Sequence, residues 1–405
     1  MRPDESDHLH SRGDGILKIL VVAPLPPPEH GGIVNWSRII RKTFVAAPDV
    51  RLEFVDTMPR YRKSYDRSLA KRWLGGSVKA LRDIGRVRQR LVHERFDVLH
   101  LCTSGWPATL RDILILRMAR RFDVPSILHY RMGWLPERAA KKSLPWAFAL
   151  RAMRLANVVV TLDVRSDAVV KQAISGHRAE ILPNMVEIDA VDALRLHASG
   201  VSEAASPRHM RLLYVGHVLP DKGVRELVAA AARLREHGVL LDIVGPVEPW
   251  FRRKLLAIAG PSGAAEWLTF HDCVDHSTAI RHMLAADVFA LPSYGEGAPN
   301  TVLEAMACGK PTVSCPVGAV PEMLDIDGPQ ECGLCVPCRE VDALTSALES
   351  LIVAPEKRRA LGNAARRRVE QLYAVPLACD RLKALWQSLV RHGDTAKTKA
   401  GMSPI

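Results

Sequence analysis

The sequence predicts an α/β protein with two doubly wound domains, each built on a parallel sheet. Short apolar runs, such as residues 16–23 and 211–215, alternate with longer segments whose apolar residues recur at helical spacing. This alternation of strands and helices occurs twice along 405 residues, a length that supports two cores. In such folds ligands bind at the carboxyl ends of the strands, so we expect the functional residues in the loops that follow them.

The first domain is expected over residues 16–197, after a disordered leader at 1–15. A stiff proline-rich loop separates the first strand from a helix that Gly31 and Gly32 open, and residues 109–122 and 145–156 have further helical patterns. The buried strands are predicted at 16–23, 50–55, 96–102, 124–133 and 158–162.

A polar, small-residue stretch at 198–209 is the expected linker. The second domain is expected over residues 210–375, followed by a helix at 376–392 and a disordered tail at 393–405. Its strands are predicted at 211–215, 240–245, 268–274, 287–291 and 311–315, and its helices at 224–237, 278–286, 301–308, 342–351 and 357–372.

The composition is that of a globular protein, with 48% hydrophobic and 25% charged residues. No apolar run has the length that a bilayer-spanning helix needs, and the polar N-terminus lacks the apolar core of a secretory signal, so we expect a cytoplasmic protein. Eight scattered cysteines do not suggest a disulfide framework. Cys332, Cys335 and Cys338 have metal-like spacing without a nearby fourth ligand, and we expect no metal.

The formal net charge of +12 lies entirely in residues 1–200, which hold 33 Lys and Arg against 21 Asp and Glu. Residues 58–90 are the most basic part, and Tyr61, Tyr65 and Trp73 lie among their cations. This segment is either a solvated helix face or a contact for an anionic membrane surface, which such aromatics favour. No nucleic-acid recognition motif is present, so nucleic acid is not an expected partner.

The stretch at 291–313, LPSYGEGAPNTVLEAMACGKPTV, combines a strand end, a loop and a short helix. Asn300 or Thr301 is the expected N-cap, and Gly309 ends the helix. Free N–H groups at a helix start favour a diphosphate, and Gly297 allows a close approach of the backbone. Glu304 is placed to accept hydrogen bonds from a ribose diol, and Glu296 from sugar hydroxyls.

This stretch resembles the Glu-x7-Glu signature of glycosyltransferase family 4 (group 1), the retaining GT-B enzymes that use nucleoside-diphosphate sugars. The family pattern EG-x-P-N-x-x-LEAMA-x-G-x-PV is followed closely. The resemblance covers residues 16–392 and implies two Rossmann-like domains that face a central cleft, with the last helix crossing back to the first domain. It implies that the following residues contact the donor: Gly31, Gly32, His217, Lys222, Val274, Gly297, Ala298, Pro299, Asn300, Thr301, Val302 and Glu304.

The resemblance also implies catalytic roles for Glu296 and for Lys222, which matches the family's phosphate-binding lysine. Many relatives have a histidine at the end of the 124–133 strand. Arg131 occupies that position here, and His129 lies two residues earlier on the same face, so either side chain could point into the cleft. His217 stands where the family often has arginine.

The implied reaction is metal-independent transfer of a sugar, with retained anomeric configuration, to a lipid-linked or polysaccharide acceptor. No cofactor is expected. The motifs do not distinguish UDP, GDP or ADP as the nucleotide. Two alternatives remain open, namely a GT-B epimerase or hydrolase that needs no acceptor, and an inactive GT-B scaffold that the changes at Arg131 and His217 would explain.

Overall fold

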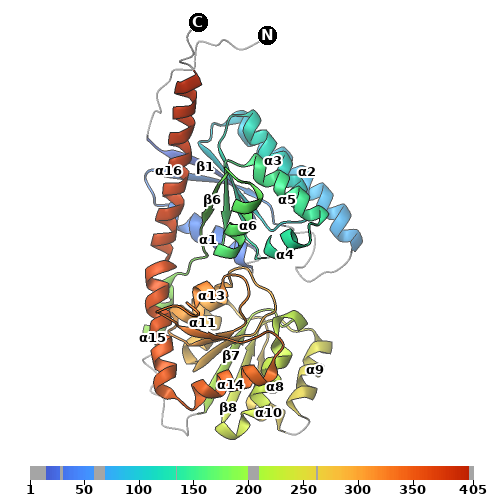
Figure 1. The fold of residues 1–405 in the computed structure, drawn as a ribbon, viewed down its shortest axis with the longest axis vertical. Helices are drawn as coiled ribbons and strands as arrows, with labels where there is room; N and C mark the ends of the chain where they lie inside the picture. The colour runs from blue at the N-terminus through green and yellow to red at the C-terminus, as the bar shows by residue number, and fades with distance from the viewer. Residues whose placement is uncertain are drawn as a thin grey trace.

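The computed structural model describes residues 15–27, 31–58, 69–133, 135–198, 209–260 and 263–400. Within these ranges the chain forms two parallel six-stranded sheets with helices packed around each (Figure 1). This confirms the predicted α/β class with two doubly wound domains. The expected leader, most of the linker and the last five residues of the tail lie outside the described ranges.

The first sheet has the strand order β2-β1-β3-β4-β5-β6, and all neighbouring strands are parallel. The order reverses between β1 and β3, so the loops that follow these strands flank a topological switch point, where doubly wound sheets bind ligands. The strands are β1 (Leu17–Ala23), β2 (Val50–Asp56), β3 (Val98–Thr103), β4 (Ser126–Tyr130), β5 (Val158–Thr161) and β6 (Arg178–Ile181).

Amphipathic helices pack on this sheet because their apolar residues recur at helical spacing. In α1, for example, Trp36, Ile39, Ile40 and Phe44 are buried against the strands. The helices of the first domain are α1 (Gly32–Phe44), α2 (Leu69–His93), α3 (Thr109–Arg121), α4 (Leu135–Ala140), α5 (Leu144–Leu155) and α6 (Val164–Ala173).

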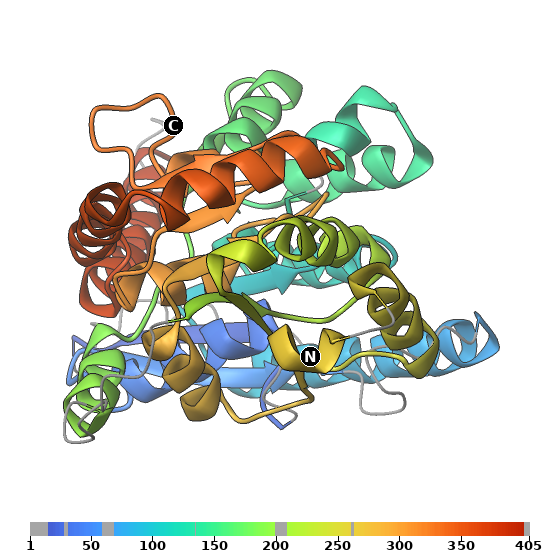
Figure 2. The same ribbon diagram turned by 90° about the horizontal axis from the view of Figure 1, so that it is seen from below.

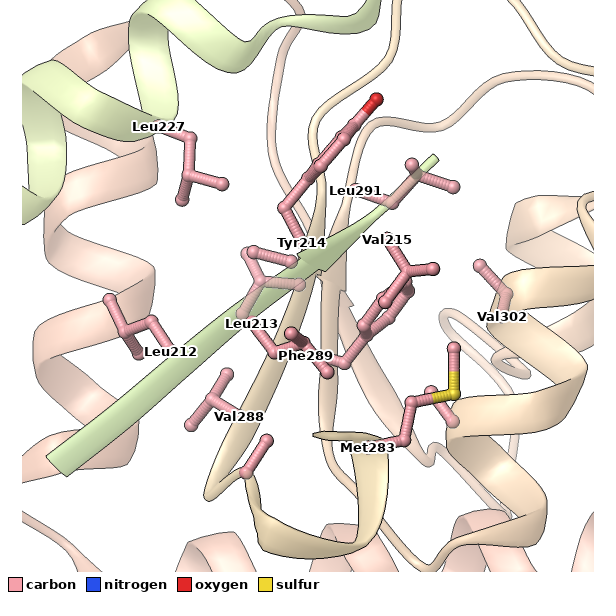
Figure 3. Packing of buried hydrophobic residues seen from close by; sticks show 14 of the residues in the cluster. Leu212, Leu213, Tyr214, Val215, Leu227, Met283, Val288, Phe289, Leu291 and Val302 are labelled. Atoms are coloured by element: carbon pink, nitrogen blue, oxygen red, sulfur yellow. The ribbon is translucent and has the colours of Figure 1, made fainter. Parts of the chain in front are cut away.

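The second sheet has the order β12-β11-β10-β7-β8-β9, with its switch point between β7 and β10. The loops after these two strands hold Lys222 and Glu296. Figure 3 shows the core beneath them, where Leu213 and Phe289 are fully or almost fully buried. The strands are β7 (Met210–Val215), β8 (Val239–Val244), β9 (Leu268–His271), β10 (Val288–Leu291), β11 (Thr312–Ser314) and β12 (Gly333–Cys335).

Helices lie on both sides of the second sheet, as the view along the molecule in Figure 2 shows. The sequence predicted most of them, but not α9 or the short α10 and α13. The helices are α8 (Val224–Arg233), α9 (Pro249–Ala259), α10 (Ala264–Trp267), α11 (His276–Ala285), α12 (Asn300–Ala307), α13 (Val320–Met323), α14 (Val341–Ile352) and α15 (Pro355–Leu372), with 3-10 turns η2 (Pro220–Lys222) and η3 (Arg235–His237).

The chain passes between the domains twice, and the two passages touch. After β6 it enters α7 (Ile188–Ala198), which packs on α11 and α12 of the second domain, although the sequence assigned these residues to the first domain. The return passage begins at Tyr373, whose carbonyl accepts a hydrogen bond from the Val186 N–H at 3.0 Å. Val186 and Ala374 form a parallel bridge, so the two passages are joined.

The return passage leads into the long helix α16 (Val375–Ala400), which lies along the first domain in Figure 1. Leu382 and Trp386 are buried in the same core cluster as α1 and β1. The helix continues to Ala400, so the expected disordered tail from residue 393 is wrong for the part that the structure describes.

Candidate functional site

A glycine contact joins the two domains at the loop after β10, residues 292–299. A Cβ atom added to Gly133, which follows β4 of the first domain, would lie 2.1 Å from the Glu296 carbonyl oxygen. On the other side, a Cβ at Gly318 would lie 2.2 Å from the Gly297 carbonyl oxygen. That carbonyl accepts a hydrogen bond from the Ala319 N–H at 2.7 Å. The loop is therefore held between two glycines where no larger residue fits.

Lys222 and Glu296 form an ion pair in the second domain, with Nζ and Oε1 2.7 Å apart. Lys222 ends the turn η2, and Gly223 behind it has a φ of +66°, which favours glycine. A Cβ at Gly223 would meet the Pro292 carbonyl oxygen at 1.9 Å, so the lysine turn packs directly on the loop. The structure thus brings together two residues that lie far apart in the sequence.

Glu304, in α12, contacts His276 at the start of α11. The His276 Nε2 and Glu304 Oε1 atoms are 3.1 Å apart. Glu304 is buried, whereas about half of the His276 side chain is exposed. The hydrogen bond to Glu304 raises the pKa of His276 above its ordinary value, and Arg38 and Glu187 also act on it across the domain boundary. No sequence pattern pointed to His276, because no motif around it indicates a contact with Glu304.

The start of α12 faces the first domain. A Cβ at Gly32 would lie 3.8 Å from Asn300 Nδ2, so the first turns of α1 and α12 approach each other. The expected cap at Asn300 or Thr301 is wrong, because Pro299 is the N-cap and Asn300 is already helical. Val302 is fully buried, so its side chain belongs to the core, and its N–H already donates to the Pro299 carbonyl at 3.1 Å.

The other end of α12 is capped by two arginines. The Ala307 carbonyl accepts hydrogen bonds from Arg195 at 3.2 Å and from Arg366 at 2.6 Å. Positive charge at a helix C-terminus complements the helix dipole. These contacts fix the axis of α12 and therefore the direction of its free N-terminal N–H groups.

The remaining donor-side predictions lie around the same loops. Gly31, with a φ of +117°, is the N-cap of α1. His217 is exposed after β7, and its carbonyl accepts a hydrogen bond from the Tyr214 hydroxyl at 2.8 Å. Val274 is half-buried at the exit of β9, two residues before His276. Ala298 is buried and reaches the first domain through its backbone.

Asn184 makes that connection, which sequence reasoning missed. Its Nδ2 donates to the Ala298 carbonyl at 2.5 Å, and its Oδ1 accepts from Arg131 Nη2 at 2.5 Å. Nearby, the Glu322 carboxylate accepts from the Val164 N–H at 2.8 Å, and burial raises the pKa of Glu322. In the sequence, Pro183 and Asn184 after β6 indicate a turn but do not indicate a contact with Ala298.

Arg131 Nη1 lies 3.4 Å from His129 Nε2, but the two residues differ in exposure. Arg131 lies at the domain boundary with 9% of its surface exposed, but His129 is completely buried. The expectation that His129 could point into the cleft is therefore wrong. Its ring packs edge-on against Trp36, and its Nδ1 lies 3.1 Å from His100 Nε2.

His100, Cys102 and His129 could in principle hold a metal ion, since their ligand atoms lie within 4.8 Å of one another. Trp386 Nε1 already donates to His100 Nδ1 at 3.1 Å, and the two imidazoles bond to each other. Burial raises the pKa of the Cys102 thiol to about 12, which leaves it a poor ligand. Together with the neighbouring Arg131 cation, these contacts indicate a hydrogen-bonded chain and not a metal centre.

Residues 209–353 match the protein family described as Glycosyl transferases group 1. The second domain is a group 1 glycosyl transferase domain. This confirms the predicted resemblance to the group 1 glycosyltransferases, and the Glu-x7-Glu stretch falls inside the matched range.

Curated relatives of the group 1 domain include a mannosyltransferase from Mycolicibacterium hassiacum, "MMP alpha-(1->4)-mannosyltransferase". It is 34% identical over 174 residues, which are 42% of this chain and 41% of the relative. A "D-inositol 3-phosphate glycosyltransferase" from Arthrobacter is 24% identical over 80% of this chain and 78% of its own. The match to the mannosyltransferase thus spans about two fifths of that protein.

Among solved structures, sucrose-phosphate synthase from Thermosynechococcus elongatus superposes with a TM-score of 0.73 and 18% identity, covering 93% of this chain and all of the other. A protein from Anabaena (Alr3699/HepE), crystallised with UDP, gives 0.65 with 16% identity, covering 92% and 100%. These likenesses confirm the GT-B arrangement of the two domains.

Gly133→Ala is expected to disturb residues 292–299, the loop of the group 1 domain that packs against the first domain. The added methyl group would overlap the Glu296 carbonyl oxygen, so hydrogen exchange of the amides in residues 292–299 should rise. Mass spectrometry after exchange measures this. Gly85→Ala in α2 is the control, because a Cβ there meets no atom within 4 Å and should stabilise the helix by up to about 1 kcal/mol. Unchanged exchange in Gly133→Ala would refute the steric account.

The His276–Glu304 contact predicts a pH dependence of stability. The folded-state pKa of His276 lies above its unfolded value, so the contribution of the pair is complete below the unfolded pKa and is lost as pH rises through the folded pKa. His276→Gln should therefore cost most stability at acidic pH, with the difference from wild type shrinking toward pH 8.5. Urea unfolding at several pH values tests this. A difference that grows with pH would contradict it.

Proposed function

We propose that the chain is a retaining glycosyltransferase that moves a sugar from a nucleoside-diphosphate sugar to an acceptor hydroxyl. The observation that carries this proposal is the Lys222–Glu296 ion pair at the switch point of the group 1 domain, in the loop that leads into α12. A cation, a carboxylate and the N-terminus of a helix capped by arginines at its far end together suit a diphosphate and the sugar attached to it.

Each group has a distinct role in this proposal. The N–H groups at the start of α12 bind the diphosphate, and Glu304 accepts hydrogen bonds from the ribose diol, held in orientation by His276. Glu296 binds sugar hydroxyls. Lys222 meets the negative charge that builds on the leaving diphosphate, a task that preorganised donors perform well in a partly buried site.

The bond between the anomeric carbon and the diphosphate oxygen breaks, and a bond to the acceptor oxygen forms on the same face of the sugar. The acceptor proton passes to an oxygen of the leaving diphosphate. Retention and metal independence are part of the proposal, and what supports them is the family resemblance of the site residues together with the position of Lys222.

The names of the relatives guide the choice of substrates to test. One mycobacterial relative is named for GDP-mannose and a phosphatidylinositol monomannoside, and several others are named for inositol 3-phosphate. A structural neighbour was solved with UDP-glucose. A glycolipid or polysaccharide acceptor, reached from the cytoplasmic face of a membrane, therefore fits the proposed enzyme.

Helix α2 supports a membrane-side acceptor. Val78 and Leu81 have exposed fractions of 51% and 69%, and Arg82 and Arg86 are exposed on the same helix. Exposed apolar residues among cations are typical of surfaces that bind anionic lipid. Most of the basic segment before residue 76 lies outside the described side chains. In the described part of the chain, no helix is long and apolar enough to cross a membrane.

The first test is donor binding and turnover. UDP, GDP, ADP and their sugars are screened by calorimetry, and one nucleotide class should bind. Glu304→Ala should weaken the preferred donor about ten- to a hundredfold, because a hydrogen bond to a charged group contributes about 1.5–3 kcal/mol. Lys222→Ala should lower the rate at saturating donor more than threefold, a barrier increase above about 0.7 kcal/mol. Lys254→Ala, on α9, is the control.

Two outcomes would contradict the proposal. Turnover of the donor at the same rate with and without acceptor would favour a hydrolase or an epimerase. The absence of binding to every nucleoside diphosphate would favour a non-catalytic scaffold.

The second test is sedimentation with liposomes. Anionic vesicles should bind the protein at low salt and release it at high salt, since each cation near the surface contributes about 1 kcal/mol that salt screens. Replacing five basic residues by Gln should weaken binding while donor affinity remains; these are Arg62, Lys63, Arg67, Lys71 and Arg72. The control replaces three cations of α9 by Gln, namely Arg252, Arg253 and Lys254. Equal binding to neutral and anionic vesicles would leave the segment as a solvated surface.

A further inference from the structure

Arg131 is a buried cation without an anionic partner. Among the described residues no carboxylate forms an ion pair with it, and burial lowers its pKa to about 10. Arg111 shows the usual solution, because that guanidinium, with 11% of its side chain exposed, is paired with Asp112 at 2.8 Å and with Asp83 at 3.4 Å. An unpaired buried charge is costly, so the environment of Arg131 is incomplete without a counter-charge.

The hydrogen bonds of Arg131 are incomplete too. Its Nη2 donates to Asn184, and its guanidinium lies over the Trp36 ring at 5.0 Å. Its Nε is buried and meets no acceptor in the described structure. A cation over an aromatic face is stabilised in part, but the ring offers no acceptor for the Nε–H group.

The hydrogen-bonded histidines beside Arg131 carry one N–H group for which the described residues supply no acceptor. Burial lowers the pKa values of His100 and His129, so both rings are neutral and each carries one N–H. Trp386 Nε1 can only donate, which makes His100 Nδ1 the acceptor at 3.1 Å and His100 Nε2 the donor to His129. The remaining His129 N–H, on Nε2, then faces Arg131 Nη1, also a donor, at 3.4 Å.

The reverse order of donors would be less favourable. It would bring the His100 N–H against the Trp386 N–H across 3.1 Å, and donors repel more strongly at this shorter distance. The longest contact in the chain is the one that lies beside Arg131. Three unsatisfied features therefore meet at one place: an uncompensated positive charge, an N–H group of arginine and an N–H group of histidine. All three lack the same thing, a negatively charged acceptor.

The location of Arg131 suggests where that acceptor comes from. Asn184 connects Arg131 to the Ala298 carbonyl of the loop before α12, and Gly133, two residues after Arg131, packs on Glu296. Arg131 thus lies on the first-domain side of the boundary, opposite the loop that holds Glu296. With 9% of its surface exposed, Arg131 reaches the molecular surface at this boundary.

We propose that Arg131 receives an oxyanion of the substrate, either a carboxylate on the transferred sugar or a phosphate on the acceptor. A guanidinium binds both groups through paired N–H bonds, and a hydrogen bond between two charged partners is stronger than one between neutral groups. The inference rests on the proposed function, since it assigns the substrate class of that same site. The proposed function assigns the donor diphosphate to the start of α12 and to Lys222, so the oxyanion for Arg131 is a further charged group of the substrate.

Matched pairs of compounds test the inference. The donor arm compares UDP-glucose with UDP-glucuronic acid and GDP-mannose with GDP-mannuronic acid, by calorimetry. The acceptor arm compares inositol with inositol 3-phosphate, by initial rate. Wild-type protein should prefer the charged member of one pair at least about tenfold, as a hydrogen bond to a charged group allows. A preference in the donor arm identifies a sugar carboxylate, and one in the acceptor arm an acceptor phosphate.

Substitutions of Arg131 show whether this residue causes the preference for the charged compound. Arg131→Gln should reduce it to within about twofold, and Arg131→Lys should keep part of it, because the ammonium retains charge but not the fork of donors. Arg117→Gln, which removes an exposed arginine from α3 of the same domain, should keep all of it. If Arg131→Gln does not fold, Arg131→Met replaces it, because the methionine stem can still cover Trp36.

The outcomes separate the inference from the proposed function. A protein that binds UDP or GDP but prefers neither member of any pair overturns the role of Arg131 alone. A preference that survives in Arg131→Gln also overturns it. Failure to bind any nucleoside diphosphate overturns the proposed function and this inference together.

Discussion

The arrangement of the two domains depends on backbone packing against backbone at three glycines. Gly133 of the first domain and Gly318 of the second lie on either side of Gly297, at distances that leave no room for a Cβ atom at the outer two. Backbone contacts of this kind place the polypeptide more rigidly than side chains do, because they have no rotamers to change. The position of Glu296 relative to the first domain follows from this contact.

The charged groups of the site are arranged on that framework in two layers. Lys222 with Glu296, and His276 with Glu304, belong to the group 1 domain and are paired with each other. Arg131 comes from the first domain and forms no ion pair with any carboxylate that the structure describes. The second domain therefore presents charged groups that already form ion pairs, whereas the first domain contributes the Arg131 cation without one. This division agrees with a donor that is held by the second domain and with a charged substrate group that is selected at the domain boundary.

Much of this could be predicted from the sequence where the information is local. Apolar runs predicted ten of the described strands within one to three residues but not β6 or β12. The Glu-x7-Glu stretch predicted the loop and α12, because strand ends, glycines and helix patterns are encoded in adjacent residues. The Asn184–Ala298 bond, the His276–Glu304 contact and the burial of His129 join distant parts of the chain. No periodicity predicts them, since they depend on how two sheets meet. The assignment of α7 to the first domain failed for the same reason.

The joined passages at Val186 and Tyr373 have a consequence for how the molecule moves. A chain with two widely separated crossings between its halves would resist any relative rotation, but here both crossings run through one hydrogen-bonded point. Any rotation of one half relative to the other would therefore turn about this one point, and α16, buried on the first domain through Trp386, would move with that half.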